Sequence, residues 1–273
     1  ENVTFSPVVS SVQPVVDRLK TEGVDIVILL CHNGYDRDIA NASELDGVDV
    51  IVGGHSHAFL SGADTTATGP YPTVVQSKSA EPVLIVHASD YLKYLGCLNL
   101  VFDERGVVKS WRGEPIPLDT SVPDDYDMAG YVYRKNEELR PFVQKIIGST
   151  TVELTRVDCG ESTIGNLVAD SMLWKAGGQG VEIAIVNGGG IRTDIPAGDI
   201  PRSTLMEVLP FGNTLATFRI TGANIRQAFE HGVSTAVQPA DGASIGRFLY
   251  MSGARIVWDS TKPQYSRIVS VEV

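Results

Sequence analysis

The stretch DIVILLCHNG at residues 25–34 and the stretch VDVIVGGHSH at residues 48–57 decide the fold of this chain. Each is an apolar run that ends in histidine, and a run that is apolar on both faces is typical of a central strand in a covered parallel sheet. Residues 36–45 between them have a helical pattern. The two stretches therefore predict a right-handed βαβ unit in an α/β fold.

The flanking residues extend this unit in both directions. An amphipathic helix is predicted over about residues 11–22, because apolar residues recur there at helical spacing. Residues 61–72, SGADTTATGPYP, have the composition of a loop. Further strands are expected at Val83–Val86 and over 94–102, with a turn at 103–106 leading into a hairpin strand at Val107–Trp111.

Three regions are predicted along the chain. Residues 1–122 form a first domain, the charged and helix-prone residues 123–147 form a linker with Pro141 kinking its helix, and residues 148–273 form a second domain. Within the second domain we expect a helix over Ser162–Lys175, a strand over Val181–Val186 that enters a glycine turn, and a helix over Gly222–His231.

Composition excludes some classes of function. The 273 residues carry a net charge of −11, which argues against nucleic acid as a partner. A small phosphate ester remains possible, because bound metal ions can dominate the local field. Apolar runs are all far shorter than the roughly 20 residues that a membrane span needs. Three cysteines without a CxxC motif do not form a disulfide scaffold.

Three of the five histidines stand where one of the two strands of the βαβ unit ends. His32 follows the first strand, and His55 and His57 follow the second. Ligands bind at the carboxyl ends of strands in open α/β sheets. If residues 53–57 are extended, His55 and His57 point the same way, and imidazole is a good ligand for zinc, manganese or iron. Chance clustering is the alternative. His87 is expected to be structural or to support the site.

The ordered set of motifs resembles the 5′-nucleotidase family. The two histidine stretches are similar to the second half of its calcineurin-like metallophosphoesterase domain. Three later segments, GNL at 165–167, NGGGIR at 187–192 and LPFGN at 209–213, are similar to its C-terminal nucleotide-binding domain. The resemblance implies a partial metallophosphoesterase sandwich followed by a mixed α/β nucleotide-binding domain.

The resemblance also implies roles for single residues. It makes His32, His55 and His57 metal ligands, and it makes Asn187, Gly189, Arg192, Phe211 and Asn213 substrate contacts. Arg192 can fork onto phosphate oxygens, the glycine turn can present amides, Phe211 can stack on a base, and Asn213 can read a base edge. The alternatives are a surface ion pair for Arg192, a core aromatic for Phe211 and a structural turn for Asn213.

The chain also departs from the family pattern. The motifs that supply the bridging aspartate, the catalytic histidine and the closing aromatic segment are absent, so no catalytic residue is assigned. Asp158 stands where an arginine is usual, and Arg156 is the candidate replacement in the phosphate clamp. We therefore expect an incomplete piece of an enzyme, with negligible activity by itself, whose missing partners are N- and C-terminal segments of the same protein.

The implied activity of the complete protein is hydrolysis of nucleoside 5′-monophosphates with two divalent ions, zinc or manganese. Its implied location is the periplasm, the cell surface or outside the cell. Two other functions stay open. One is a sister hydrolase that acts on 2′,3′-cyclic nucleotides, nucleotide sugars or other pyrophosphates, and the other is a noncatalytic nucleotide-binding module.

Overall fold

The computed structural model describes residues 4–157, 159–236 and 246–273. The chain divides into two compact units, Glu1–Pro123 and Asp124–Val273. Helices and strands occur in both units, so the predicted mixed α/β class is confirmed.

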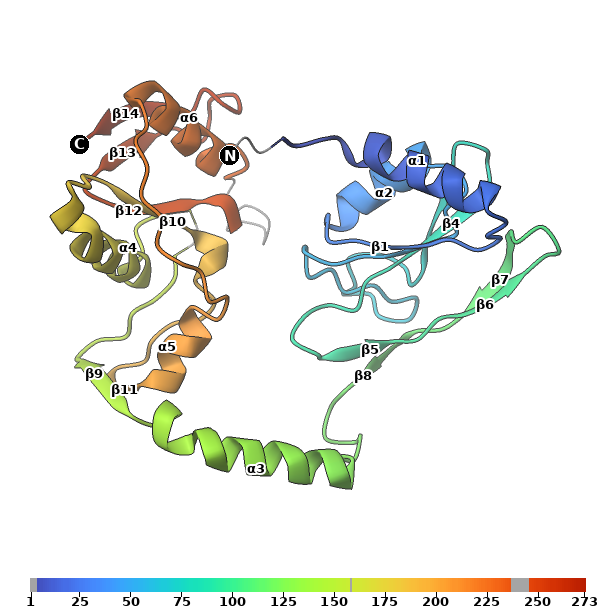
Figure 1. Ribbon diagram of the computed structural model, residues 1–273, viewed down its shortest axis with the longest axis horizontal. Helices are drawn as coiled ribbons and strands as arrows, with labels where there is room; N and C mark the ends of the chain where they lie inside the picture. The colour runs from blue at the N-terminus through green and yellow to red at the C-terminus, as the bar shows by residue number, and fades with distance from the viewer. Residues whose placement is uncertain (1–3, 158, 237–245) are drawn as a thin grey trace. The chain divides into compact units, whose positions relative to one another are not determined.

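The first unit is built on a four-stranded sheet with the order β1-β2-β4-β3. Strands β1, β2 and β4 are parallel, and β3 runs antiparallel to β4. Helix α1 precedes β1, and α2 connects β1 to β2, which confirms the predicted βαβ unit; Figure 1 shows the two helices on one side of the sheet. The bounds are α1 Val8–Thr21, β1 Ile28–Leu30, α2 Tyr35–Glu44, β2 Val50–Val52, β3 Thr73–Gln76 and β4 Pro82–Val86.

The apolar side chains of these elements form the core of the first unit. Leu45, Ile51, Leu60 and Ile85 are completely buried there. Burying side chains of this size contributes about 1.5–3 kcal/mol each. The core therefore holds the helices on the sheet and fixes where the three parallel strands end.

Strand β1 corrects the prediction of a central strand. Within the described residues β1 pairs with β2 alone and lies at an edge of the sheet. It is also shorter than expected, and the side chains of Ile28 and Leu30 are 60% and 79% exposed. An apolar run shows that a strand can be covered on both faces, but which neighbours pair with it is decided by distant parts of the chain.

Two antiparallel pairs complete the first unit. The predicted hairpin is confirmed as β6 with β7. The single strand expected over 94–102 is wrong, because two strands occupy it and the first of these, β5, pairs with β8 instead. The bounds are β5 Tyr94–Gly96, β6 Asn99–Phe102, β7 Val108–Arg112 and β8 Pro115–Pro117.

The second unit begins with the long helix α3, Tyr126–Val143, which is capped by the side chain of Asp125 and contains Pro141 in its last turn. No residue of α3 is buried. Its C-terminal end packs on α5, where the Arg202 guanidinium lies 4.1 Å from the centre of the Phe142 ring. The amide of Arg202 also donates to the carbonyl of Lys145. These contacts join the end of α3 to the rest of the second unit.

Helices α4 and α6 pack with short antiparallel strand pairs in the rest of this unit, around a core that contains Ile164, Ile191 and Phe229. The predicted helices over Ser162–Lys175 and Gly222–His231 are confirmed within two residues, with Ser162 and Thr221 as N-caps. The bounds are β9 Ile146–Thr150, α4 Thr163–Ala176, η1 Gly177–Gln179, β10 Ala184–Asn187, η2 Gly188–Gly190, β11 Gly198–Pro201, α5 Arg202–Val208, α6 Gly222–Val233, β12 Leu249–Ser252, β13 Arg255–Trp258 and β14 Ile268–Glu272.

A buried polar cluster ties α6 to β14. The two carboxylate oxygens of Glu230 accept the backbone N–H groups of Arg267 and Ile268 at 2.8 and 2.9 Å. In return, the Arg267 guanidinium donates to the carbonyls of Val233 and Ala236 at the C-terminal end of α6. A cation at this end of a helix is also favoured by the helix dipole. The cluster satisfies polar groups that would be costly to bury alone.

None of the helices in the described ranges is long and apolar enough to cross a membrane.

Candidate functional site

The three predicted metal-ligating histidines are exposed at the carboxyl ends of β1 and β2. His32 and His55 lie side by side, with ring centres 5.2 Å apart and ring planes at 67°. Gly54 makes room for this arrangement, because a Cβ there would lie only 2.9 Å from Nδ1 of His32. The structure therefore brings together two of the three histidines across neighbouring strand ends.

The turn that carries His55 and His57 is not extended as the sequence reasoning assumed. Both residues have positive φ, 78° and 56°, and the amide of Ser56 donates to the carbonyl of Gly54. The alternation rule for extended chains therefore does not apply here. His57 instead pairs with Asp90, its Nδ1 lying 3.2 Å from Oδ2 of the carboxylate.

Asp90 lies on a short loop that follows β4. Burial raises the pKa of its carboxyl, but the hydrogen bond and charge of Lys93 outweigh that effect, with a contribution from His57, so the pKa lies below its ordinary value. Ser89, Tyr91 and Leu92 on the same loop all have positive φ. Such conformations cost on the order of 1–3 kcal/mol each in non-glycine residues and often occur at functional sites.

A buried polar network that sequence reasoning missed lies beneath the histidine turn. Asp38 on α2 is completely buried, and its Oδ2 is 2.8 Å from Nε2 of His87, which is 3% exposed. The Sγ of Cys31 donates to the other oxygen of Asp38 at 3.1 Å. Burial, followed by this bond and the negative charge of Asp38, raises the pKa of the Cys31 thiol to about 12.

The available sequence signal for Asp38 was its place on the helix. Tyr35, Asp38 and Ala42 form the buried face of α2 at positions i, i+3 and i+7. An acid on the buried face of a helix needs a partner. His87, which sequence analysis placed in a structural or supporting role, is that partner.

The fit of these residues to a metal is partial. Two adjacent exposed imidazoles are suitable ligands for zinc or manganese. Within the described ranges, however, no group of three or more His, Cys, Asp or Glu side chains is arranged to hold a metal ion. The described residues thus offer two adjacent imidazoles and not a complete metal centre.

In the second unit, most of the predicted substrate contacts are adjacent to one another. The Arg192 guanidinium lies 5.7 Å from the centre of the Phe211 ring, and its Nη1 donates to the carbonyl of Gly189. Nη1 of Arg156 donates to the carbonyl of Arg192, while its Nε is buried and has no hydrogen-bond partner among the residues that the structure describes. Because Phe211 is 58% exposed, its ring is open to a ligand.

Of the remaining residues of this set, Asn187 begins the glycine turn and Asn213 lies on an exposed segment. The side chain of Asn187 donates to the carbonyl of Gly246 at 3.0 Å, which holds the side chain in place. Asn213 is exposed, just beyond Gly212, whose φ is +62°. Asp158 lies outside the described residues. The second unit therefore presents arginine, glycine-turn and aromatic groups together, which are suited to an anion attached to a flat ring.

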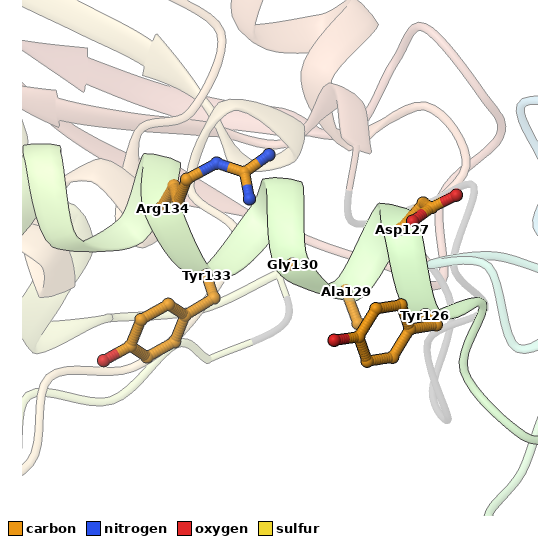
Figure 2. A pocket seen from close by; sticks show the side chains of 6 residues that line it. All are labelled: Tyr126, Asp127, Ala129, Gly130, Tyr133 and Arg134. Carbon is orange, nitrogen blue, oxygen red and sulfur yellow. The ribbon is translucent and has the colours of Figure 1, made fainter.

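Two hollows lie elsewhere on the described surface. One is on α3 and is lined by Tyr126, Asp127, Ala129, Gly130, Tyr133 and Arg134 (Figure 2). The two tyrosines and Ala129 lie on one side of the helix and Arg134 on the other, so charged and aromatic groups do not converge. The second is an apolar groove along β1, β2, β4 and β6, bordered by Gly53 and His87.

Comparison with known proteins gives a consistent result. Residues 146–273 match the family described as 5′-nucleotidase, C-terminal domain. The whole chain is 35% identical to a human 5′-nucleotidase, of which it spans 50%, and 99% of it is 35% identical to an apyrase of Aedes aegypti, of which it also spans 50%. The chain thus spans about half the length of the curated relatives it matches.

A solved structure supports the same relationship. The chain superimposes on a 5′-nucleotidase precursor of Thermus thermophilus with a TM-score of 0.76 and 37% identity, which covers 99% of this chain and 54% of the other. The matched 99% of the chain includes residues of both units. Residues 146–273 therefore belong to the family of 5′-nucleotidase C-terminal domains, and the chain as a whole is similar to 5′-nucleotidases.

Proposed function

We propose that the protein to which this chain belongs hydrolyses nucleoside 5′-monophosphates to nucleoside and phosphate. The main support is the 35% identity over the whole chain to a protein named 5′-nucleotidase. The matched residues include both the histidine turn and the arginine–aromatic cluster. Relatives with the names 5′-nucleotidase and apyrase are hydrolases of nucleotides, which supports this wider class of activity.

The two units would have different roles, metal binding in the first and nucleotide binding in the second. His32, His55 and His57 would help to hold two divalent ions, zinc or manganese, with further ligands from another segment of the whole protein. Such ions polarise a phosphoryl oxygen and supply hydroxide at neutral pH. Because the described residues offer only a pair of adjacent imidazoles, we propose that this chain by itself has negligible hydrolytic activity.

In the second unit, the cluster around Arg192 would bind the nucleotide. The exposed ring of Phe211 offers a face for the base, and Asn213, two residues later in the chain, offers a side-chain amide for a base edge, while Asn187 lies at the start of the glycine turn. Arg192, the amides of the glycine turn and Arg156 would bind the anionic end. The buried Nε of Arg156, which has no partner within residues 4–157, 159–236 and 246–273, supports this assignment, because an unpaired buried donor costs about 1–3 kcal/mol unless a ligand satisfies it.

A second activity has a specific observation in its favour. The apyrase of Aedes aegypti is as similar to this chain as the human 5′-nucleotidase is, at 35% identity. Hydrolysis of a pyrophosphate bond is therefore the alternative proposal for the whole protein. Relatives that include snake venom 5′-nucleotidases support a location outside the cytoplasm, at the cell surface, in the periplasm or secreted.

The nucleotide site can be tested in the chain as it stands. Adenosine and AMP are titrated separately against the wild type and the variants Phe211→Ala and Arg192→Ala. Loss of stacking on one ring costs about 1–3 kcal/mol, so Phe211→Ala should weaken both ligands by about 5- to 150-fold. Arg192→Ala should weaken AMP and leave adenosine nearly unchanged.

Two matched controls lie on the same exposed segment. Phe218→Ala and Arg219→Ala remove the same side-chain types at exposed positions and should change neither affinity. Equal losses of adenosine and AMP binding in Arg192→Ala, with the fold intact by circular dichroism, would contradict the phosphate role of Arg192. Equal effects of Phe211→Ala and Phe218→Ala would contradict stacking on Phe211.

A further inference from the structure

The buried pair of Asp38 and His87 lies where three parallel strands end. Cys31 follows β1, Gly53 follows β2 and His87 follows β4, while Asp38 comes from α2. The carboxylate of Asp38 joins two of these ends, accepting the Cys31 thiol on one oxygen and approaching His87 Nε2 at 2.8 Å with the other. One buried carboxylate therefore connects the residue before His32 with the end of β4.

The third strand end packs directly on the same pair. A Cβ on Gly53 would lie 2.1 Å from Oδ2 of Asp38 and 2.1 Å from Nε2 of His87. The backbone of Gly53 is thus in close contact with the pair. Gly54 and His55 follow at once, and Gly54 leaves the space that Nδ1 of His32 occupies.

We propose that Asp38 and His87 are positioning residues that set the rings of His32 and His55 against each other. The pair acts from below on both sides of the site, through Cys31 on the side of His32 and through Gly53 on the side of His55. Buried, hydrogen-bonded side chains are well suited to this task, because a site is precise only when the shell behind it is rigid. Its consequence for metal binding rests on the proposed function.

The experiment compares variants of the whole chain by nuclear magnetic resonance of the histidine rings. The chain has five histidines, so each ring signal can be assigned by single substitution. His87→Leu fills similar space without a donor, whereas His87→Gln keeps an N–H that can reach Asp38. Asp38→Asn keeps the shape and removes the buried charge without opening a cavity, so it is the second variant to measure if His87→Leu does not fold. Asp36→Asn, on the exposed side of the same helical turn, is the control.

The expected result divides the variants into two groups. In the wild type, Asp36→Asn and His87→Gln, the rings of His32 and His55 should show a cross-relaxation signal, as their centres lie 5.2 Å apart. In His87→Leu and Asp38→Asn that signal should disappear while the amide spectrum of the core is retained. If the folded Asp38→Asn variant keeps the signal and the shifts of both rings, the pair is merely structural and the proposal is overturned.

A titration with Zn²⁺ alone separates this proposal from the proposed function. Loss of supporting contacts behind ligands typically lowers metal affinity by about 10- to 100-fold. The Zn²⁺ affinity measured from the ring signals of His32 and His55 should therefore fall by at least about tenfold in Asp38→Asn. If Zn²⁺ shifts neither ring in the wild type, the metal role of the histidines fails, while the ring signals still decide whether Asp38 and His87 position them.

Discussion

Replacement of Gly53 by alanine should strongly destabilise the first unit. Gly53 does not have a positive φ, so the backbone itself accepts a Cβ. The obstacle is the buried pair beneath it, since Oδ2 of Asp38 and Nε2 of His87 would each lie 2.1 Å from the new atom and would have to retreat by about 0.9 Å to reach 3.0 Å. That movement breaks their 2.8 Å hydrogen bond.

The magnitude follows from two costs. Leaving a buried polar group without its partner costs about 1–3 kcal/mol. Forcing an extra carbon into a packed interior costs about another 1–3 kcal/mol. We expect Gly53→Ala to lower the free energy of unfolding by about 2–6 kcal/mol, which is a large part of the roughly 5–15 kcal/mol typical of a domain.

The assay is urea denaturation followed by tryptophan fluorescence. Trp111 belongs to the first unit and Trp174 and Trp258 to the second, so a Trp174→Phe/Trp258→Phe background makes the signal specific to the first unit. Gly54→Ala is the matched variant. Its Cβ would lie 2.9 Å from Nδ1 of His32, and the ring of this exposed side chain can move away at smaller cost than the buried pair. A loss of stability in Gly53→Ala no larger than that in Gly54→Ala would refute the reasoning.

Three further predictions concern other parts of the chain. Because the pKa of Cys31 is about 12, only about one thiol in a thousand is ionised at pH 9. Iodoacetamide should therefore modify Cys31 only after urea is added, and mass spectrometry would detect the modification. Burial raises the pKa of Asp49 above 3.8, so the folded state binds that proton more tightly than the unfolded state. In urea titrations, the stability of Asp49→Asn relative to the wild type should therefore rise as the pH increases from about 3 to about 6. A stability difference that stays constant over this range would contradict the prediction. Removing the contact with Phe142 through Arg202→Ala should cost about 0.5–2 kcal/mol and speed hydrogen exchange in the last turn of α3, whereas unchanged exchange would show that this contact does not hold the helix end.

Much of the fold could be predicted because its signals are local. Helical spacing of apolar residues identified α1, α2, α4 and α6, and the alternation of strand and helix identified the parallel unit. The edge position of β1 could not be predicted, because pairing depends on residues far away in the sequence. The division of residues 94–102 was missed for the same reason, since β5 pairs with β8 and not with its neighbour in the chain.

The candidate site was predictable in its residue types and less so in its geometry. Strand ends placed His32 and His55 in one region, but the positive φ of His55 and His57 changed the direction of the turn. Asp38 gave a weaker signal, because an acid in the first turn of a helix is also favoured by the helix dipole alone. Its partner His87 lies 49 positions away, and only the folded chain brings the two together.

The cluster of Glu230 and Arg267 has a consequence for how the second unit unfolds locally. Glu230 binds the amides of Arg267, just before β14, and of Ile268, its first residue, across 37 and 38 positions of the chain, and Arg267 in turn donates to the end of α6. Helix and strand can therefore separate only when these charge-assisted bonds break together. Local fraying of β14 should be suppressed, and the amide hydrogen of Ile268 should exchange with solvent as slowly as those of the core, through the same cooperative unfolding that exposes Phe229.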